Sequence, residues 1–150
     1  MNLHIKLLIG TLAFVSAYAP SHEFHNATPF DLRAELDVKL GFDKHEDLPK
    51  YQKKEIPVGA HLLRGIKVKG TIGQHPLQDL VEERKVLGLG HITYYIFCMP
   101  VIERKDIPGG YSDQITKVKF YLVRLPRGSA YPGGLVAESK LIEIASHRRR

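Results

Sequence analysis

The chain has 150 residues, of which 43% are hydrophobic and 25% are charged, and its net charge at pH 7 is +6. These values are typical of one globular domain, and they exclude a wholly disordered chain, a collagen-like or coiled-coil protein and a polytopic membrane protein. A single cysteine excludes an intramolecular disulfide framework and any cysteine-rich zinc module.

Residues 1–19 have the pattern of a secretory signal peptide. A start with one lysine precedes a nine-residue apolar stretch, and small residues follow. Cleavage after Ala17 or after Ala19 fits this pattern, and Pro20 disfavours the second site because proline restricts the backbone around the cut. The uncharged run is 15 residues long, shorter than the roughly 20 that cross a bilayer. We therefore expect a secreted or periplasmic protein without a transmembrane span; the alternative is a buried N-terminal strand or helix of a cytosolic domain.

Residues 20–145 are expected to form one all-β domain, followed by a basic tail at residues 146–150. In residues 31–39 four apolar side chains alternate with five charged ones, which is the period of a strand with one buried and one solvated face. Residues 91–101 form a continuous apolar run, which indicates a central strand covered on both faces. We expect further strands at residues 23–28, 66–72, 115–125 and 141–144.

Proline and glycine punctuate these segments and favour turns over helices. The exception is a short helix expected around residues 76–86, where apolar side chains have helical spacing. Six or seven strands separated by turns predict an antiparallel β-sandwich of the Ig-like kind, with a small β-barrel as the alternative. The absence of tryptophan and of a cysteine pair excludes an antibody-type domain. The expected turns are at residues 107–110, 126–128 and 131–134.

Two short patterns allow more than one interpretation. Residues 53–59 resemble residues 104–110, which suggests either a duplicated β-unit or two separate uses of one Pro-Gly turn. Asn26-Ala27-Thr28 fits the N-glycosylation sequon, and Pro29 directly after it should lower occupancy.

No catalytic or cofactor motif is present. The sequence lacks G-x-S-x-G, and its glycine pairs lie between expected strands and not before a helix, so neither a nucleophile elbow nor a phosphate loop is indicated. Cys98 lies in an apolar segment, where we expect a buried and inert thiol; an intermolecular disulfide is the alternative. We therefore predict a protein that is not an enzyme and has no cofactor. An enzyme whose site is assembled across loops is the third hypothesis.

Two of the seven histidines after the expected signal peptide suggest a metal site. His22 and His25 are close together in the sequence and could chelate a metal with Glu23. Cleavage after Ala19 would instead let the new amino group, the Ser21 amide and His22 form a copper-type clamp. A periplasmic metal-binding protein is the second hypothesis. The alternative is that these are surface or turn histidines that bind no metal.

Basic residues are concentrated in the C-terminal part, since residues 1–50 have a net charge of −2 and residues 101–150 have +5. The leading hypothesis is an exported, non-enzymatic binding module for a protein, a glycan or an anionic envelope surface. Export makes a nucleic-acid partner unexpected, and a solvated basic face without a partner is the alternative. The candidate contacts with an anionic partner are Lys67, Lys69, Lys117 and Lys119, together with Arg148, Arg149 and Arg150 in the tail.

Overall fold

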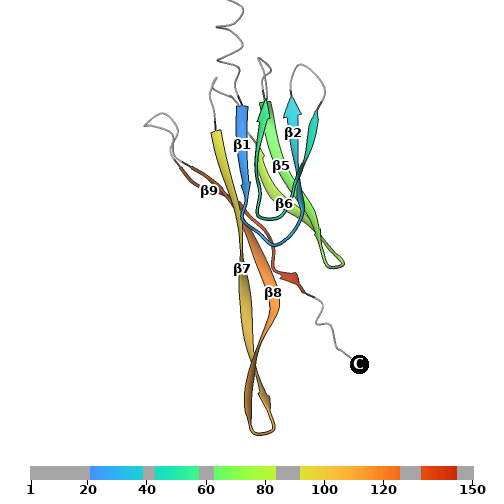
Figure 1. The fold of residues 1–150 in the computed structure, drawn as a ribbon, viewed down its shortest axis with the longest axis vertical. Coiled ribbons are helices and arrows are strands. Elements are labelled where there is room, and N and C mark those ends of the chain that lie inside the picture. Colours follow the sequence, from blue (N-terminus) through green and yellow to red (C-terminus); the bar gives the residue numbers. More distant parts are fainter. Residues whose placement is uncertain (1–20, 39–42, 58–62, 84–91, 126–132, 145–150) are drawn as a thin grey trace, which may run out of the picture.

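The computed structural model describes residues 21–38, 43–57, 63–83, 92–125 and 133–144, which contain ten β-strands and no helix (Figure 1). The expected all-β fold is confirmed. The expected signal peptide at residues 1–19 and the expected basic tail at residues 146–150 lie outside the described residues. The strands are β1 (Ser21–Asn26), β2 (Leu32–Val38), β3 (Lys44–Leu48), β4 (Lys53–Pro57), β5 (Leu63–Ile72), β6 (His75–Glu83), β7 (Ile92–Ile107), β8 (Gly110–Arg124), β9 (Gly134–Glu138) and β10 (Ile142–Glu143).

The strands form two sheets, as a β-sandwich requires. The six-stranded sheet has the order β10-β8-β7-β1-β4, with β9 also paired to β8, and the four-stranded sheet has the order β3-β2-β5-β6. Neither sheet closes into a barrel, so the barrel alternative is wrong. Ten strands exceed the six or seven expected, and the described pairs are antiparallel except for β1 and β7, which run parallel.

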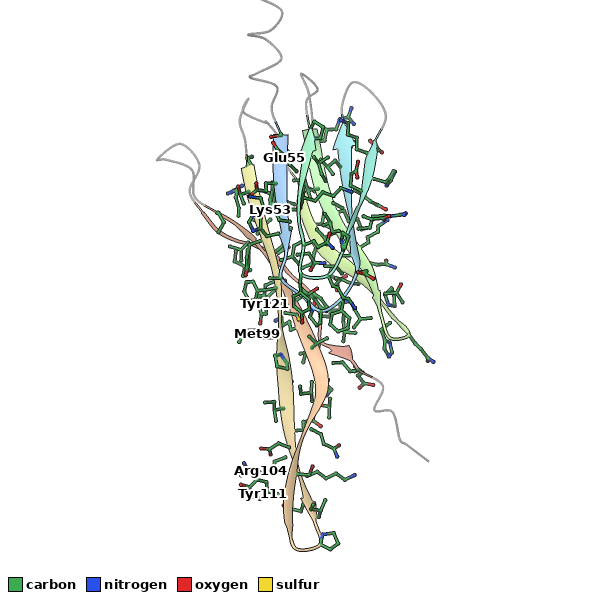
Figure 2. All side chains as sticks on the ribbon, viewed as in Figure 1. Lys53, Glu55, Met99, Arg104, Tyr111 and Tyr121 are labelled. Carbon is green, nitrogen blue, oxygen red and sulfur yellow. The ribbon has the colours of Figure 1, made fainter. Side chains whose placement is uncertain are left out.

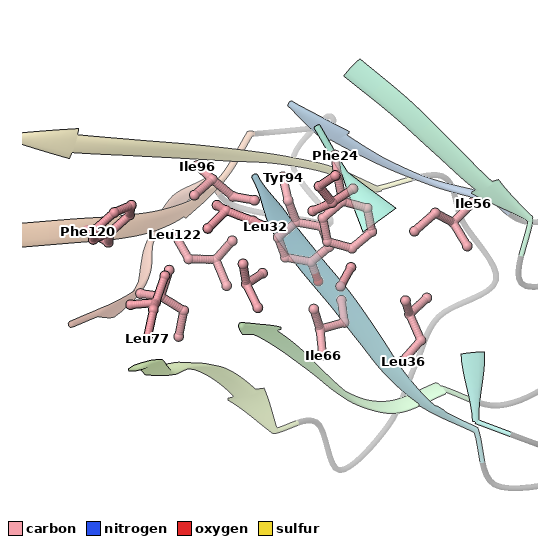
Figure 3. Packing of buried hydrophobic residues seen from close by; sticks show 14 of the residues in the cluster. Phe24, Leu32, Leu36, Ile56, Ile66, Leu77, Tyr94, Ile96, Phe120 and Leu122 are labelled. Carbon is pink, nitrogen blue, oxygen red and sulfur yellow. The ribbon is translucent and has the colours of Figure 1, made fainter. Parts of the chain in front are cut away.

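The core lies between the two sheets and follows from the alternation along each strand. In β2 the side chains of Leu32, Ala34 and Leu36 are buried while the residues between them face outward. In the six-stranded sheet, Phe24 of β1 stacks on Tyr94 of β7 with ring centroids 5.2 Å apart. Figure 3 shows Phe24, Leu32, Leu36 and Tyr94 between the layers.

A polar group on the four-stranded sheet, the Glu82 carboxylate, joins the two sheets at the margin of this core. The Glu82 carboxylate of β6 accepts a hydrogen bond from the Tyr94 hydroxyl at 2.5 Å and one from the Arg124 guanidinium of β8 at 2.7 Å. Tyr94 thus contributes its ring to the core and its hydroxyl to a polar partner on the facing sheet, which is how a buried tyrosine is usually satisfied.

The short helix expected around residues 76–86 is wrong, because residues 75–83 are strand β6. The helical spacing of its apolar residues has a local cause. Val68 pairs with Leu80 and Gly70 pairs with Leu77. Between these two pairs β6 advances by three residues while β5 advances by two, so β6 has one extra residue. This bulge shifts the alternation by one residue, and both leucines point into the core. A β-bulge has therefore produced the spacing that resembles a helix.

Asn26, at the end of β1, holds three chain segments together. Its side-chain amide donates to the carbonyl oxygens of Phe30 and Leu48, both at 2.8 Å, and to that of Pro49 at 3.2 Å. Its Oδ1 accepts from the Thr28 backbone at 3.1 Å and from the Thr28 hydroxyl at 2.7 Å. Asn26 is 1% exposed. The sequon is therefore a structural element, and a glycan on Asn26 is incompatible with this fold.

Strands β7 and β8 continue as a two-stranded hairpin beyond the rest of the sandwich (Figure 1). The parallel pairing of β1 with β7 ends at Ile96, and β10 pairs with β8 only at residues 117 and 118. Among the described residues, β7 and β8 therefore pair only with each other from Ile102 and Ile115 to the Pro108-Gly109 turn. We call residues 102–115 the arm. The expected turn at its end is confirmed, and Gly109 supplies a φ of 91° there.

Candidate interaction surface

The two histidines of the metal hypothesis lie on opposite faces of β1. His22 is 4% exposed and points into the core, with its ring edge toward Tyr94 at a centroid distance of 6.2 Å. His25 points outward, and its Nε2 lies 2.5 Å from a Glu23 oxygen. Residues three apart in a strand face opposite ways, so this pair does not converge on one ion. Within the described ranges no three His, Cys, Asp or Glu side chains are grouped as a metal site.

The four candidate lysines do not form one basic edge. Lys67 and Lys69 lie on the outer face of the four-stranded sheet, and Lys117 and Lys119 lie on the outer face of the six-stranded sheet. These two faces point away from each other. Three of the four are matched by acids: Lys69 to Glu35 at 2.7 Å, Lys117 to Glu103 at 3.6 Å and Lys119 to Glu138 at 3.0 Å. The tail arginines 148–150 lie outside the described residues.

Glu35 and Lys69 belong to a small ionic cluster on the outer face of the four-stranded sheet. The hydrogen bond from Lys69 holds the pKa of the Glu35 carboxyl below its ordinary value, and the charge of His45, at 3.7 Å, acts in the same direction. On the other sheet, hydrogen bonds from His25 and then from Lys53 lower the pKa of Glu23. Both acids are therefore stabilised in their ionised form.

These lowered pKa values predict a loss of stability in acid. A carboxyl whose pKa is lower in the folded than in the unfolded chain contributes stability above the unfolded pKa, and this stability disappears as pH falls through the folded pKa. For the solvent-accessible Glu35 we expect a contribution of about 0.5 kcal/mol, lost below about pH 4.5. Urea unfolding at a series of pH values should show a shallower decline for Glu35→Gln than for the wild type. Glu46→Gln is a control, and equal slopes for the Glu35 variant and the wild type would contradict the prediction.

Two open depressions lie along the four-stranded sheet, with volumes of about 700 and 620 Å³. The first contains the ion pair between Arg33 and Asp47, at 3.1 Å, and the pair between Lys69 and Glu35. Its charged groups thus face one another, and they are not arranged as a nucleophile beside a base.

The outer face of the six-stranded sheet is different, because it carries a cluster of aromatic and apolar side chains. Phe97 of β7 stacks on Tyr121 of β8, with centroids 5.1 Å apart and an interplanar angle of 16°, and Tyr95 lies 6.2 Å from Phe97. Met99, the next outward residue of β7, is 54% exposed. We call Tyr95, Phe97, Met99 and Tyr121 the aromatic face; Figure 2 labels Met99 and Tyr121 near the base of the arm.

The prediction that residues 91–101 are covered on both faces is therefore wrong. Only the side of β7 with Ile92, Tyr94 and Ile96 is buried in the core. The sequence contained a signal for this, since the expected strand at residues 115–125 places Lys117, Lys119 and Tyr121 on one side. Neighbouring strands share their faces, so a partner strand with lysines indicates that β7 also has a solvated side. Cys98 is only half-buried, and its burial raises the pKa of the thiol.

The arm carries a second group of exposed apolar side chains, which is interrupted by the ion pair between Arg104 and Asp113 at 3.1 Å. Ile102 and Ile115 are directly opposite each other in the ladder and are 61% and 54% exposed. Tyr111 lies on the same side of the ladder and is 59% exposed, with the Arg104 guanidinium 3.9 Å from its ring centroid. Figure 2 shows Arg104 and Tyr111 near the end of the arm. This side continues the core-facing side of β7, and its exposure shows that the four-stranded sheet does not cover it.

The described part of the chain has no helix that is long and apolar enough to cross a membrane. Comparisons of the chain with protein-family models, with curated proteins and with solved structures give no match.

Proposed function

We propose that this chain is an exported, non-enzymatic interaction module that binds a protein through the aromatic face and the arm. The observation that carries the proposal is the exposure of Met99, Ile102, Tyr111 and Ile115, each more than half exposed, on two neighbouring parts of one molecule. Exposed apolar surfaces of this kind in a protein with a polar opposite face mark sites of contact with other macromolecules. The pattern of residues 1–19 supports export.

The arrangement of the rings favours a protein partner over a sugar or a nucleic acid. Phe97 and Tyr121 stack on each other, so each ring already uses one of its faces. A platform for bases offers open ring faces with free cations beside them. Here the nearest cation, Lys119, is paired with Glu138. A surface of aromatic and aliphatic side chains with ion pairs at its margin resembles the composition of a protein interface.

A photo-reactive amino acid tests this proposal in the cells that produce the protein. Placed at Phe97 or at Tyr111, it should yield a protein adduct; placed at Val81, on the outer face of the four-stranded sheet, it should not. Excess wild-type chain should suppress the adduct, whereas a Met99→Glu chain should not, because its charge disrupts the surface. Equal adducts at all three positions would contradict the proposal. So would binding to anionic vesicles that is lost on charge reversal of Lys67 and Lys69 alone.

A further inference from the structure

The turn between β3 and β4 holds a tyrosine in a backbone conformation that suits glycine. The Gln52 N–H donates to the Pro49 carbonyl oxygen at 3.2 Å, which makes residues 49–52 a β-turn with Tyr51 at its third position. Tyr51 has a φ of 57°, and it is the only non-glycine residue with a positive φ in the described part of the chain. Lys50 before it therefore has a negative φ, and the two together give the pattern of a type II turn. The third position of such a turn favours glycine or asparagine, because a side chain with a Cβ is strained there.

The rest of the fold imposes this conformation on the turn. The Tyr51 N–H donates to the Thr28 carbonyl oxygen at 3.2 Å, and the Lys50 N–H donates to Oδ1 of Asp31 at 3.0 Å. The buried amide of Asn26 also donates to the carbonyl oxygen that begins the turn, at 3.2 Å. A strained residue persists only where its surroundings determine its conformation in this way. Tyr51 is therefore held at one fixed place on the surface.

The Tyr51 side chain does not repay this strain through contacts within the fold. It is 69% exposed, more than any other large hydrophobic side chain among the described residues. Within the same ranges, its hydroxyl has no hydrogen bond and its ring has no aromatic contact. A bulky residue that strains a turn and stays in water breaks a local sequence rule, and such exceptions are typical of functional positions.

Tyr51 lies at the margin of the aromatic face. The pairing of β1 with β4 on one side and with β7 on the other aligns Lys53 with Tyr95. Two positions further toward the end of the sheet, the same row contains Tyr51 and Phe97, one on each side of β1. The Asn26 N–H donates to the carbonyl oxygen of the residue after Tyr51 at 2.9 Å, so the ladder continues to this level. Neighbouring strands are about 4.8 Å apart, which places the two backbones on the order of 10 Å from each other.

We propose that Tyr51 is an anchor of the interaction surface: the protein that binds the aromatic face also covers the β3–β4 turn and takes the Tyr51 side chain into a pocket. This inference rests on the proposed function, since it extends the same surface. A tyrosine held in place suits this role, because its ring buries a large area while few rotatable bonds lose their freedom on binding. The pocket of the partner combines apolar atoms around the ring with a carbonyl or carboxylate acceptor for the hydroxyl.

The variant Tyr51→Gly separates binding from stability, because it removes the ring and relieves the turn at the same time. We expect its midpoint of thermal unfolding to rise by about 2–4 °C, since glycine adopts a positive φ without strain. Tyr51→Asn is a second variant that the conformation tolerates, and it should unfold at or above the wild-type temperature. Lys50→Gly is the matched control in the same turn. Its φ is negative, so glycine brings no relief and should lower the midpoint.

Competition measures the binding. The chain with the photo-reactive amino acid at Phe97 is added to an extract of the producing cells and their medium, together with an unlabelled competitor. The Tyr51→Gly chain should need an at least tenfold higher concentration than the wild type to halve the protein adduct, which is the effect of a typical anchor residue. Lys50→Gly should compete like the wild type. A photo-reactive residue at Tyr51 itself should capture the same protein as the one at Phe97.

Three results would overturn the inference and leave the proposed function intact. The first is a Tyr51→Gly chain that competes as well as the wild type, and the second is one that unfolds at a lower temperature, since Tyr51 would then be a structural residue. The third is an equal loss of competition in Lys50→Gly, because the shape of the turn and not the ring would then matter. If photo-reactive residues at Phe97 and Tyr111 yield no protein adduct, the proposed function fails, and the inference with it.

Discussion

Replacing Phe24 with alanine should lower the free energy of unfolding by about 3–5 kcal/mol. The ring is completely buried and stacks on Tyr94, so its removal leaves a cavity that neighbouring strands on a hydrogen-bonded sheet cannot close. Both the lost burial and the cavity then contribute to the cost. Urea unfolding followed by circular dichroism would measure the difference from the wild type.

Tyr95→Ala is the matched control for this variant. Tyr95 pairs with His25 across the same two strands, one position further along, but it points to the exposed face. Its truncation should lower the free energy of unfolding by about 1 kcal/mol or less, because Tyr95 is 36% exposed and does not belong to the core. Similar losses in the free energy of unfolding for the two alanine variants would show that the face of β1 and β7 containing Phe24 is not the core.

The substitution Asn26→Asp should lower the free energy of unfolding by about 2–4 kcal/mol, although it exchanges only one group of nearly the same size. The aspartate cannot donate hydrogen bonds, so the carbonyl oxygens of Phe30, Leu48 and Pro49 lose their buried donor. The new carboxylate would also place a negative charge beside these oxygens. Urea unfolding at pH 7 would measure the loss.

Gln114→Glu is the control for Asn26→Asp, since it makes the same amide-to-acid change at an exposed position of the arm. We expect it to change the stability by less than about 0.5 kcal/mol. An Asn26→Asp chain as stable as this control would mean that the amide does not connect β1 to the end of β3.

Strand periodicity predicted the parts of the fold that have one buried and one charged side. Strand β2 was recognisable because its apolar residues alternate with five charges in the sequence. Strand β3 was not, because of its five residues only Leu48 is buried and the rest are polar. Strand β6 was mistaken for a helix because a bulge between Leu77 and Leu80 shifts the in-and-out alternation of its side chains by one residue. Periodicity detects regular strands that contribute several residues to the core, and it misses edges and bulges.

The candidate surface was harder to predict than the fold. A run of apolar residues shows that a strand is apolar on both sides, but it does not show that a second layer covers both sides. Tyr95, Phe97 and Met99 therefore looked like core residues. The opposite orientation of His22 and His25 follows once the expected strand at residues 23–28 is extended by one residue to include His22, because positions three apart in a strand point to opposite faces.

The place of β1 in the six-stranded sheet has a consequence for the order of folding. The first strand in the sequence lies between β4 and β7, and its partner β7 begins about 70 residues later in the chain. Contacts between such distant segments form slowly, because closing the long loop between them costs entropy before the contacts can stabilise the fold. The sheet that contains β1 therefore cannot form until β7 has been synthesised. Such a delay would be compatible with the export that we propose for this chain, because an exported chain crosses the membrane before it folds.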